Sequence, residues 1–292
     1  MSWSLLAQRL EKGRIVLMDG AMGTELAARG ARFEGHPLWA SSVLASSEGR
    51  QLTTEVHRGY LAAGAELLVA NTHNASAAAC RQAGADLVAI NEAAVIALRA
   101  ACEDATEPVW LAGCTMSPDR PYATTASLSV EATAEAYRPQ VELLDQLGLD
   151  LMIFEMLSTE ADVKGGAAIA HASRTPVAAG FTCGRDGRTR GGVSLVEAAA
   201  AWSMAEVLFI QCTPWPEVGP ALAALPATRV RGAYGNGGRR WTGSRFEGEA
   251  ADPDIYAEAA EGWLTQGIRV VGGCCDTGPR HVAGLARMLD RI

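Results

Sequence analysis

Short apolar runs recur along the chain, and turn residues bound each of them. Eight runs are rich in Val, Ile, Leu or Phe and show no clear alternation of polar and apolar positions: 14–20, 66–72, 109–114, 149–156, 176–183, 206–212, 229–236 and 268–275. This pattern is typical of strands buried on both faces of a parallel sheet. The sequence therefore predicts eight parallel strands.

The segments between these runs carry mostly helical patterns. Apolar residues recur at three- or four-residue steps through 129–148, where Pro139 is expected to kink the helix or mark its effective start. The last helix is expected to begin at Pro279. Eight strand–helix units predict an α/β fold of the (β/α)8 TIM-barrel type, with a single domain over residues 1–292.

Bulk composition narrows the class of protein. The chain has 292 residues, of which 49% are hydrophobic and 20% charged, with a formal net charge of −8. An acidic balance argues against nucleic acid, whose binding needs a basic face, and favours a globular enzyme of small molecules. No apolar run is long enough to predict a membrane span, and the N-terminal residues are expected to form a surface helix, not a signal peptide. Seven cysteines without a disulfide-scaffold spacing indicate reduced thiols in the cytoplasm. We expect a monomer or small homo-oligomer.

Polar and sulfur-bearing residues gather where the predicted strands end. The carboxyl ends of the strands in such a barrel face one mouth, where the connecting loops build the active site. The longer connections 21–60 and 115–128 are expected to contribute to it. The strand-end residues are Asp19, Asn71, Thr72, Cys114, Glu155, Cys183, Cys212, Asn236, Cys274 and Cys275.

The GGCC run that ends the eighth strand is the most specific feature. Neighbouring residues on a regular strand point to opposite faces, so Cys274 and Cys275 can share one ion only if the chain bends there. Gly272 and Gly273 allow such a bend. Cys212 ends the sixth predicted strand, two strands before the one that ends in GGCC, and can approach the same mouth. Three thiolates and one open position match a catalytic zinc site, so the sequence predicts that these three cysteines bind Zn²⁺.

Other interpretations of the cysteines and of the same loop remain open. Free cysteines are often simply buried, which is expected for Cys80 and Cys102 in helical patterns. Cys114 and Cys183 also end strands and are secondary candidates. A Gly-rich turn before a helix can instead hold phosphate, although Asp276 and two thiolates would repel an anion.

The chain resembles the homocysteine S-methyltransferase family over nearly its whole length. The resemblance rests on motifs in the family's order: MDGAMGTELAARG (18–30), PLWA (37–40), ANTHNAS (70–76), FEM around Glu155, IQCTP (210–214), YGNGG (234–238) and GGCCDTGPRHVAGL (272–285). It implies a zinc barrel whose metal ligands are Cys212, Cys274 and Cys275. It also implies that Asp19 and Glu155 hold the amino group of homocysteine.

This resemblance implies transfer of a methyl group to the thiolate of homocysteine, giving methionine. Zinc coordination deprotonates a thiol at neutral pH, and three protein thiolates keep the bound sulfur nucleophilic. The chain is most similar to short members that use S-methylmethionine or S-adenosylmethionine. Asn74 and Met156 stand where the betaine-using branch has aromatic residues. No cobalamin-binding module is expected.

Further residues are expected to contact the substrates, and some positions depart from the family. Asn71, Thr72, Asn236 and Trp39 are candidate substrate-binding residues, and Trp39 is placed to face a sulfonium or to act in the core or a lid. His73 is a weaker candidate. The usual Asn before the strand-six cysteine is Gln211, which leaves room for an unusual donor or for a selenol as acceptor. The remaining histidines are expected to be surface or capping groups: His36, His57, His171 and His281.

Two other functions compete with methyl transfer. One is a barrel lyase or aldolase in which the cysteines only pack, but the two lysines, Lys12 and Lys164, end no strand and offer no Schiff-base nitrogen. The other is a non-catalytic barrel that binds zinc or a thiol metabolite. Metal content and a methyl-transfer assay separate the three.

Overall fold

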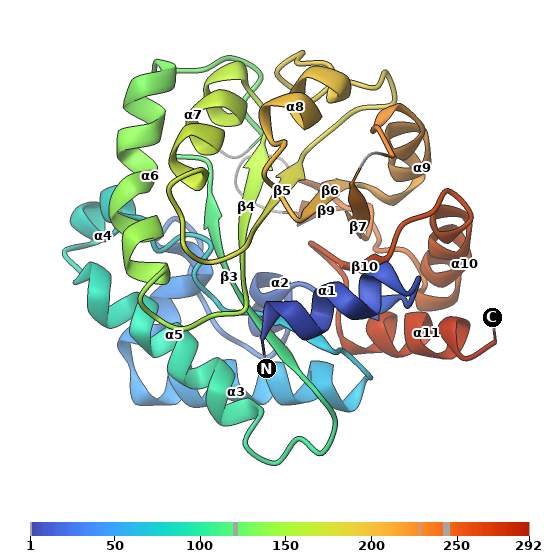
Figure 1. Cartoon of the computed structure of the whole chain (residues 1–292). Helices are drawn as coiled ribbons and strands as arrows, with labels where there is room; N and C mark the ends of the chain where they lie inside the picture. The colour runs from blue at the N-terminus through green and yellow to red at the C-terminus, as the bar shows by residue number, and fades with distance from the viewer. Residues whose placement is uncertain (1, 119–121, 228, 242–245, 292) are drawn as a thin grey trace.

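Eight parallel strands form a nearly closed barrel in the computed structural model, which describes residues 2–118, 122–227, 229–241 and 246–291 (Figure 1). Their order is β1-β10-β7-β6-β5-β4-β3-β2, and a parallel bridge between Met18 and Leu67 joins the two ends. The strands are β1 (Val16–Leu17), β2 (Leu67–Val69), β3 (Trp110–Met116), β4 (Leu151–Leu157), β5 (Val177–Phe181), β6 (Val207–Pro214), β7 (Val230–Asn236) and β10 (Val270–Gly273). The predicted single-domain (β/α)8 barrel is confirmed.

Helices connect successive strands and surround the barrel. They are α1 (Trp3–Glu11), α2 (Met22–Ala28), η1 (Trp39–Ala45), α3 (Ser47–Ala62), α4 (Ala77–Ala83), α5 (Leu87–Ala101), α6 (Val130–Leu144), α7 (Glu160–Ala170), α8 (Leu195–Ala201), α9 (Trp215–Ala224), α10 (Pro253–Leu264) and α11 (Pro279–Leu289). A short antiparallel pair, β8 (Arg240–Trp241) and β9 (Phe246–Glu247), follows β7. Helix α11 begins at Pro279, as predicted.

The start of helix α6 is fixed by a capping residue, Ser129. The Ser129 side chain accepts the backbone N–H of Ala132 and caps the first turn. The helix then continues through Pro139 to Leu144, so the expectation that Pro139 marks an effective start is wrong. Packing of the buried Tyr137 and Val141 outweighs the loss of one backbone hydrogen bond.

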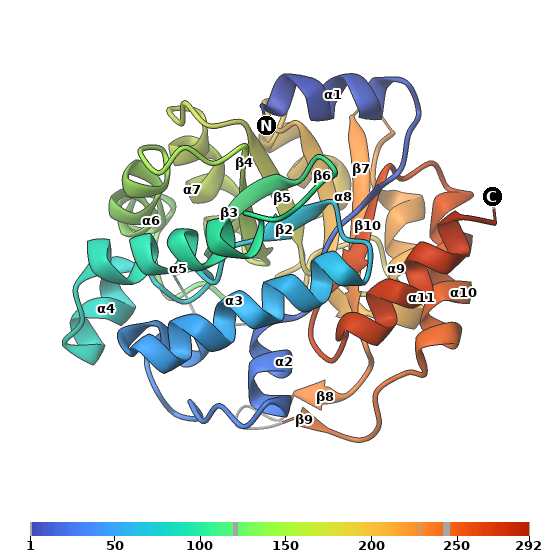
Figure 2. The ribbon, with the colours of Figure 1, turned by 90° about the horizontal axis from the view of Figure 1, so that it is seen from below.

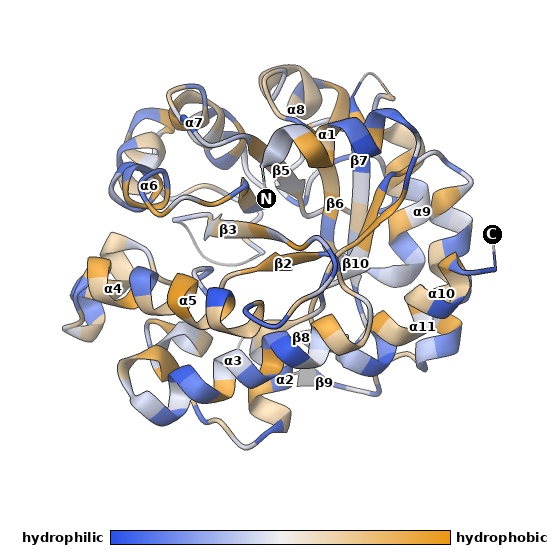
Figure 3. Cartoon of the chain, turned by 60° about the horizontal axis from the view of Figure 1, so that its bottom comes forward, coloured by the Kyte–Doolittle hydropathy of each residue, from blue (hydrophilic) through white to orange (hydrophobic). Residues whose placement is uncertain are grey.

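Two apolar layers hold the barrel together. One fills its interior with strand residues such as Ile153 and Phe209, and the other lies between the strands and the surrounding helices. Strands β2 and β3 are coloured mainly as hydrophobic in Figure 3, whereas the helices around them are mixed. Both faces of the strands are therefore buried, which explains their unbroken apolar runs.

The two ends of the barrel differ. Helix α1 covers the amino end, where its buried Leu6 and Leu10 join the interior layer and contribute roughly 1.5–3 kcal/mol each. Helix α2 and the β8–β9 pair lie at the opposite end (Figure 2). That carboxyl end is the side on which a barrel carries its site. None of the helices among the described residues has the length and apolar character to cross a membrane.

Candidate active site at the carboxyl end of the barrel

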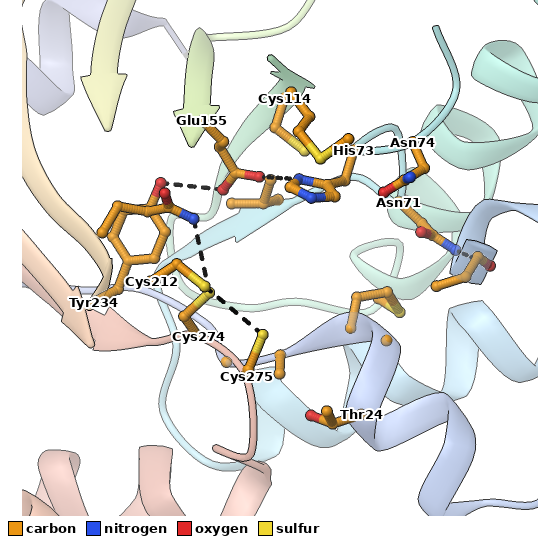
Figure 4. Close-up of a pocket in the computed structure, with 18 of the residues that line it drawn as sticks. Thr24, Asn71, His73, Asn74, Cys114, Glu155, Cys212, Tyr234, Cys274 and Cys275 are labelled. Atoms are coloured by element: carbon orange, nitrogen blue, oxygen red, sulfur yellow. Dashed lines mark hydrogen bonds and ion pairs between the residues drawn. The ribbon is translucent and has the colours of Figure 1, made fainter. Parts of the chain in front are cut away.

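A cavity of about 300 Å³ opens at the carboxyl ends of the strands (Figure 4). Its walls come from strand ends and loops that are distant in sequence, between Met18 and Cys275. Seven predicted site residues line it: Asp19, Trp39, Asn71, Glu155, Cys212, Cys274 and Cys275.

Three thiols converge on one side of this cavity. The sulfur atoms of Cys212, Cys274 and Cys275 all lie within 4.8 Å of one another, and those of Cys212 and Cys275 are 3.8 Å apart. Figure 4 shows the three side chains pointing toward a common point. The sequence prediction that β6 and the end of β10 bring these cysteines together is confirmed.

The local backbone conformation directs these three sulfurs toward the cavity. Strand β10 ends at Gly273, so Cys274 and Cys275 lie beyond the regular strand and are free of its alternation. A Cβ on Gly273 would lie 2.0 Å from Thr277 Oγ1, which makes glycine necessary for the turn. Cys212 has a left-handed backbone, with φ of 45°, and the β6–β7 register shifts between Gln211 and Pro214. This bulge turns Cys212 toward the cavity.

The thiol cluster fits a metal on geometry and on chemistry. Tetrahedral zinc with bonds of about 2.3 Å places two sulfurs about 3.8 Å apart, which is the separation of Cys212 and Cys275. The pKa of Cys212 lies well below its usual value because Cys274 and Cys275 hydrogen-bond to its sulfur. One thiolate is therefore already stabilised within the cluster, and thiolates are the ligands that soft and borderline metals prefer.

Two buried carboxylates lie on the other side of the cavity. Asp19, 3% exposed, accepts the backbone N–H of Val69 on Oδ2 at 2.8 Å. Burial, reinforced by the charge of Glu155, raises the pKa of Asp19 well above its usual value. Glu155, 7% exposed, accepts the Tyr234 hydroxyl on Oε1 at 3.0 Å. Two such groups favour a cationic guest, because a positive charge beside them offsets the cost of ionising buried carboxyl groups.

His73 is the hydrogen-bond partner of Glu155 in this carboxylate pair. Its Nδ1 lies 2.5 Å from Glu155 Oε2, and its side chain is 26% exposed on the cavity wall. Burial opposes protonation, but the charge of Glu155 and the hydrogen bond to it outweigh burial and raise the pKa of His73. His73, Glu155 and the Cys114 sulfur lie within 4.8 Å of one another, as a second group of potential metal ligands. The short His73–Glu155 contact is that of a hydrogen-bonded pair.

Two candidate substrate residues lie behind the cavity wall. Thr72 Oγ1 donates to the Cys114 carbonyl at 2.6 Å and accepts the Cys114 N–H at 2.9 Å, which joins β2 to β3. Asn236 Nδ2 donates to the Cys212 carbonyl at 3.3 Å, directly behind the left-handed cysteine. Neither is among the lining residues. Asn71 does line the cavity, and its Nδ2 donates to the Ala40 carbonyl at 3.1 Å.

Trp39 and the secondary cysteines are placed as follows. Trp39 begins η1 with φ of 41° and packs edge-on against Phe33, with ring centroids 5.2 Å apart. Cys114 lines the cavity, whereas Cys183 is fully buried away from it and donates to the Phe181 carbonyl at 3.5 Å. Cys80 lies in the outer apolar layer, as expected.

Tyr234 and Tyr122 were not singled out by the sequence as site residues, and Gln211 was noted only as a departure from the family. Tyr234 holds Glu155, the Tyr122 hydroxyl lies 2.9 Å from the Cys212 sulfur, and Gln211 Nε2 lies 3.7 Å from the Cys274 sulfur. Tyr234 belongs to the strand that ends in Asn236, and Gln211 precedes Cys212, so both lie within predicted strands. Position on a strand did not reveal which side chains meet.

The expectation for His57 is wrong. It was placed among surface or capping groups, but it is fully buried on α3, and neither ring nitrogen has a hydrogen-bond partner among the residues that the structure describes. Burial lowers its pKa to about 3. His281, by contrast, does cap a helix, since its Nδ1 accepts the Gly278 N–H at the start of α11.

Fold and site together define a TIM-barrel enzyme whose mouth combines a thiol cluster with buried carboxylates. A profile described as Homocysteine S-methyltransferase matches residues 16–289, and the chain belongs to that family. This assignment decides against the lyase and the non-catalytic alternatives, and it makes the protein a methyltransferase.

Individual relatives agree with the family assignment. The homocysteine S-methyltransferase of Escherichia coli is 28% identical over 299 residues, covering 94% of this chain and 96% of the relative. Selenocysteine Se-methyltransferase of Brassica oleracea is 23% identical, with 96% and 90% covered. The crystal structure of the Escherichia coli homocysteine methyltransferase MmuM in a metallated form superposes with a TM-score of 0.81 and 27% identity, covering 95% of this chain and 98% of that one.

Proposed function

We propose that this protein transfers a methyl group from a sulfonium donor, S-methylmethionine or S-adenosylmethionine, to the thiolate of homocysteine, giving methionine. The observation that carries the proposal is the convergence of three thiols on a cavity whose opposite wall holds two buried carboxylates. An amino acid with a thiol side chain has an ammonium group to pair with the carboxylates and a sulfur to approach the thiol cluster. Residues 1–292 would act as one catalytic unit in the cytoplasm.

The thiol cluster supplies the acceptor side. Cys212, Cys274 and Cys275 would hold Zn²⁺, and the 3.8 Å separation of the Cys212 and Cys275 sulfurs fits that ion. Zinc held in this way lowers the pKa of a substrate thiol, so that the acceptor is a thiolate at neutral pH. The Tyr122 hydroxyl lies against Cys212 and helps to exclude water from this side.

The carboxylates orient the acceptor. Asp19 and Glu155 would bind its ammonium group, and the hydrogen bonds from Val69 and Tyr234 fix their directions in advance. Binding at both ends aligns the acceptor sulfur for in-line displacement. The sulfur's electron pair forms the new bond to carbon, the methyl–sulfonium bond breaks, and its electron pair neutralises the donor as a thioether.

Two positions on the cavity wall favour a sulfonium over a quaternary ammonium donor, although Trp39, Tyr122 and Tyr234 also line the cavity. A quaternary ammonium is usually recognised by a cage of aromatic rings. Here Asn74 and Met156 line the cavity at the two positions where the betaine-using branch has aromatic residues. Met18, Met22 and Met116 add further thioether surface, which is polarisable and adaptable. A betaine-like donor remains the alternative.

A selenol is the alternative acceptor. Two relatives are named as selenocysteine methyltransferases, from Brassica oleracea and Astragalus bisulcatus, and the latter is 23% identical with 99% of this chain covered. Selenocysteine carries the same ammonium and carboxylate as homocysteine on a shorter side chain. It would therefore use the same carboxylate pair and thiol cluster.

The test is a methyl-transfer assay with defined donors and acceptors. Zinc-loaded protein is incubated with homocysteine or selenocysteine and with S-methylmethionine, S-adenosylmethionine or betaine, and the methylated product is quantified. We expect methionine from homocysteine with at least one sulfonium donor and little product with betaine. Product from betaine alone would overturn the donor assignment, and methylation of selenocysteine alone would overturn the acceptor assignment.

A further inference from the structure

Gln211 connects the two walls of the cavity. It lies on β6 directly before Cys212 and is 1% exposed. Its Oε1 accepts the backbone N–H of Met156 at 3.0 Å and the Thr182 hydroxyl at 3.3 Å. Its Nε2 donates to the Cys274 sulfur at 3.7 Å. One amide therefore joins the residue after Glu155 to a member of the thiol cluster.

The orientation of this amide follows from its partners. A backbone N–H can only donate, so the atom of Gln211 that faces Met156 must be the carbonyl oxygen. The other atom of the amide is then the NH2 nitrogen, which faces the Cys274 sulfur. A donor held toward this sulfur is thus built in by the fold, because an amide flip would set two donors against each other.

The surrounding strands leave room for this side chain. Gln211 and Cys212 are consecutive, yet both line the cavity, because the bulge between Gln211 and Pro214 interrupts the strand's alternation. On the neighbouring β5, a Cβ at Gly180 would lie 3.1 Å from both Gln211 Cβ and the Tyr234 hydroxyl. Glycine at this position lets both side chains enter the site.

We propose that Gln211 is a positioning residue that holds Cys274 and tunes the charge on its sulfur through an N–H···S hydrogen bond. Negative charge concentrates on the cluster when its thiols are ionised, and a fixed donor in a buried site stabilises that charge. Met156 has φ of 61°, so the same amide also fixes the strained backbone next to Glu155. Gln211 thereby sets the spacing between the amino-group end and the sulfur end of the site. This role rests on the proposed zinc site.

The decisive variant is Gln211→Met, which keeps length and removes both amide functions. Zinc affinity is measured by competition with a chelator, and the sulfur-to-metal charge-transfer band is recorded with cobalt in place of zinc. We expect zinc affinity to fall about 10- to 100-fold, as is usual when a group behind a metal ligand is lost. The cobalt band should move to lower energy, because the Cys274 sulfur becomes more electron-rich.

Two further variants separate charge tuning from packing. Gln211→Glu keeps an acceptor for Met156 but sets a carboxylate oxygen against the sulfur, and it should weaken metal binding more than Gln211→Met. Thr182→Val removes the second partner of Oε1 together with a weak contact to the Met156 sulfur at 3.5 Å. It should change zinc affinity less than about threefold, since an exchange of one neutral hydrogen bond has a modest net effect. Circular dichroism checks that each variant is folded, and Gln211→Leu, which also lacks both amide functions, replaces Gln211→Met if the latter does not fold.

The outcomes distinguish this proposal from the proposed function. A folded Gln211→Met protein with unchanged zinc affinity and an unshifted cobalt band overturns the role of Gln211 alone. Wild-type protein that binds zinc but methylates no acceptor overturns the proposed reaction and leaves the metal readout for Gln211 intact. Wild-type protein that binds no zinc overturns both.

Discussion

Glu155 and His73 form a hydrogen-bonded pair on the cavity wall, with Oε2 and Nδ1 2.5 Å apart. Because Tyr234 donates to the other oxygen of Glu155, the carboxylate is held on both sides. It can still accept an ammonium group on its remaining lone pairs. His73 therefore helps to fix the orientation of the Glu155 carboxylate in the proposed amino-group site.

Replacing His73 should weaken acceptor binding. His73→Phe removes the partner of a buried carboxylate, and the loss of one charge-assisted hydrogen bond corresponds to roughly a 10- to 100-fold fall in kcat/KM for homocysteine. The change should appear mainly in KM. The matched variant His73→Asn can restore an N–H donor near the Nδ1 position and should lose less. Steady-state kinetics check both, and equal kinetics for wild type and His73→Phe would contradict this role.

Metal content should depend on one set of strand-end cysteines and not on another. Cys274→Ala removes a sulfur of the cluster and should abolish tight binding of one zinc per chain, together with methyl transfer. Cys183→Ala is the matched control, because Cys183 also follows a strand but does not line the cavity. Elemental analysis after dialysis measures the stoichiometry. Full zinc occupancy in Cys274→Ala would rule out its ligand role, and two zinc ions per wild-type chain would point to the His73–Cys114–Glu155 group.

A methyl group at Gly180 should crowd the site and destabilise the protein. In Gly180→Ala the new Cβ meets Gln211 and Tyr234, and overpacking of this kind costs about 1–3 kcal/mol. Gly262→Ala is the control, because Gly262 is exposed in α10 with no atom within 4 Å of an added Cβ. It should stabilise the protein by about 0.5–1 kcal/mol. Urea unfolding measures both. A Gly180→Ala protein as stable and active as wild type would show that the neighbouring side chains adjust freely.

The buried His57 should make stability fall in mild acid. Its pKa is about 3 in the folded protein and about 6.5 in an unfolded chain. Between these values the unfolded state binds one more proton, so the free energy of unfolding decreases as pH falls below 6.5. The loss of unfolding free energy approaches about 1.4 kcal/mol per pH unit and stops near the pKa of His57 in the folded protein.

His57→Leu tests this linkage because leucine needs no hydrogen-bond partner. The difference in unfolding free energy between wild type and variant should be constant above about pH 7.5. Below that pH, the wild type should lose stability faster, while contributions from the carboxylates common to both proteins cancel. Urea denaturation between pH 8 and pH 5 supplies the measurement. Parallel curves over the whole range would show that His57 gains a proton without unfolding.

Much of the scaffold followed from the sequence because its signals are local. Unbroken apolar runs specify strands that are buried on both faces. Ser129 marks a helix start through its side-chain cap and Pro279 through its fixed backbone angle. The end of a parallel strand always faces the same mouth. The convergence of Cys212 with Cys274 and Cys275 could therefore be predicted before any distance was known.

Tertiary structure decided what depends on the exact direction of a side chain. The bulge in β6 turns Gln211 and Cys212 to the same cavity. In contrast, Thr72, which follows β2, and Asn236, which ends β7, face the scaffold. Likewise, only packing of α3 shows that His57 is buried. A sequence pattern fixes which residues share an element and an end, but the contacts across strands arise from register and close packing, which no local signal encodes.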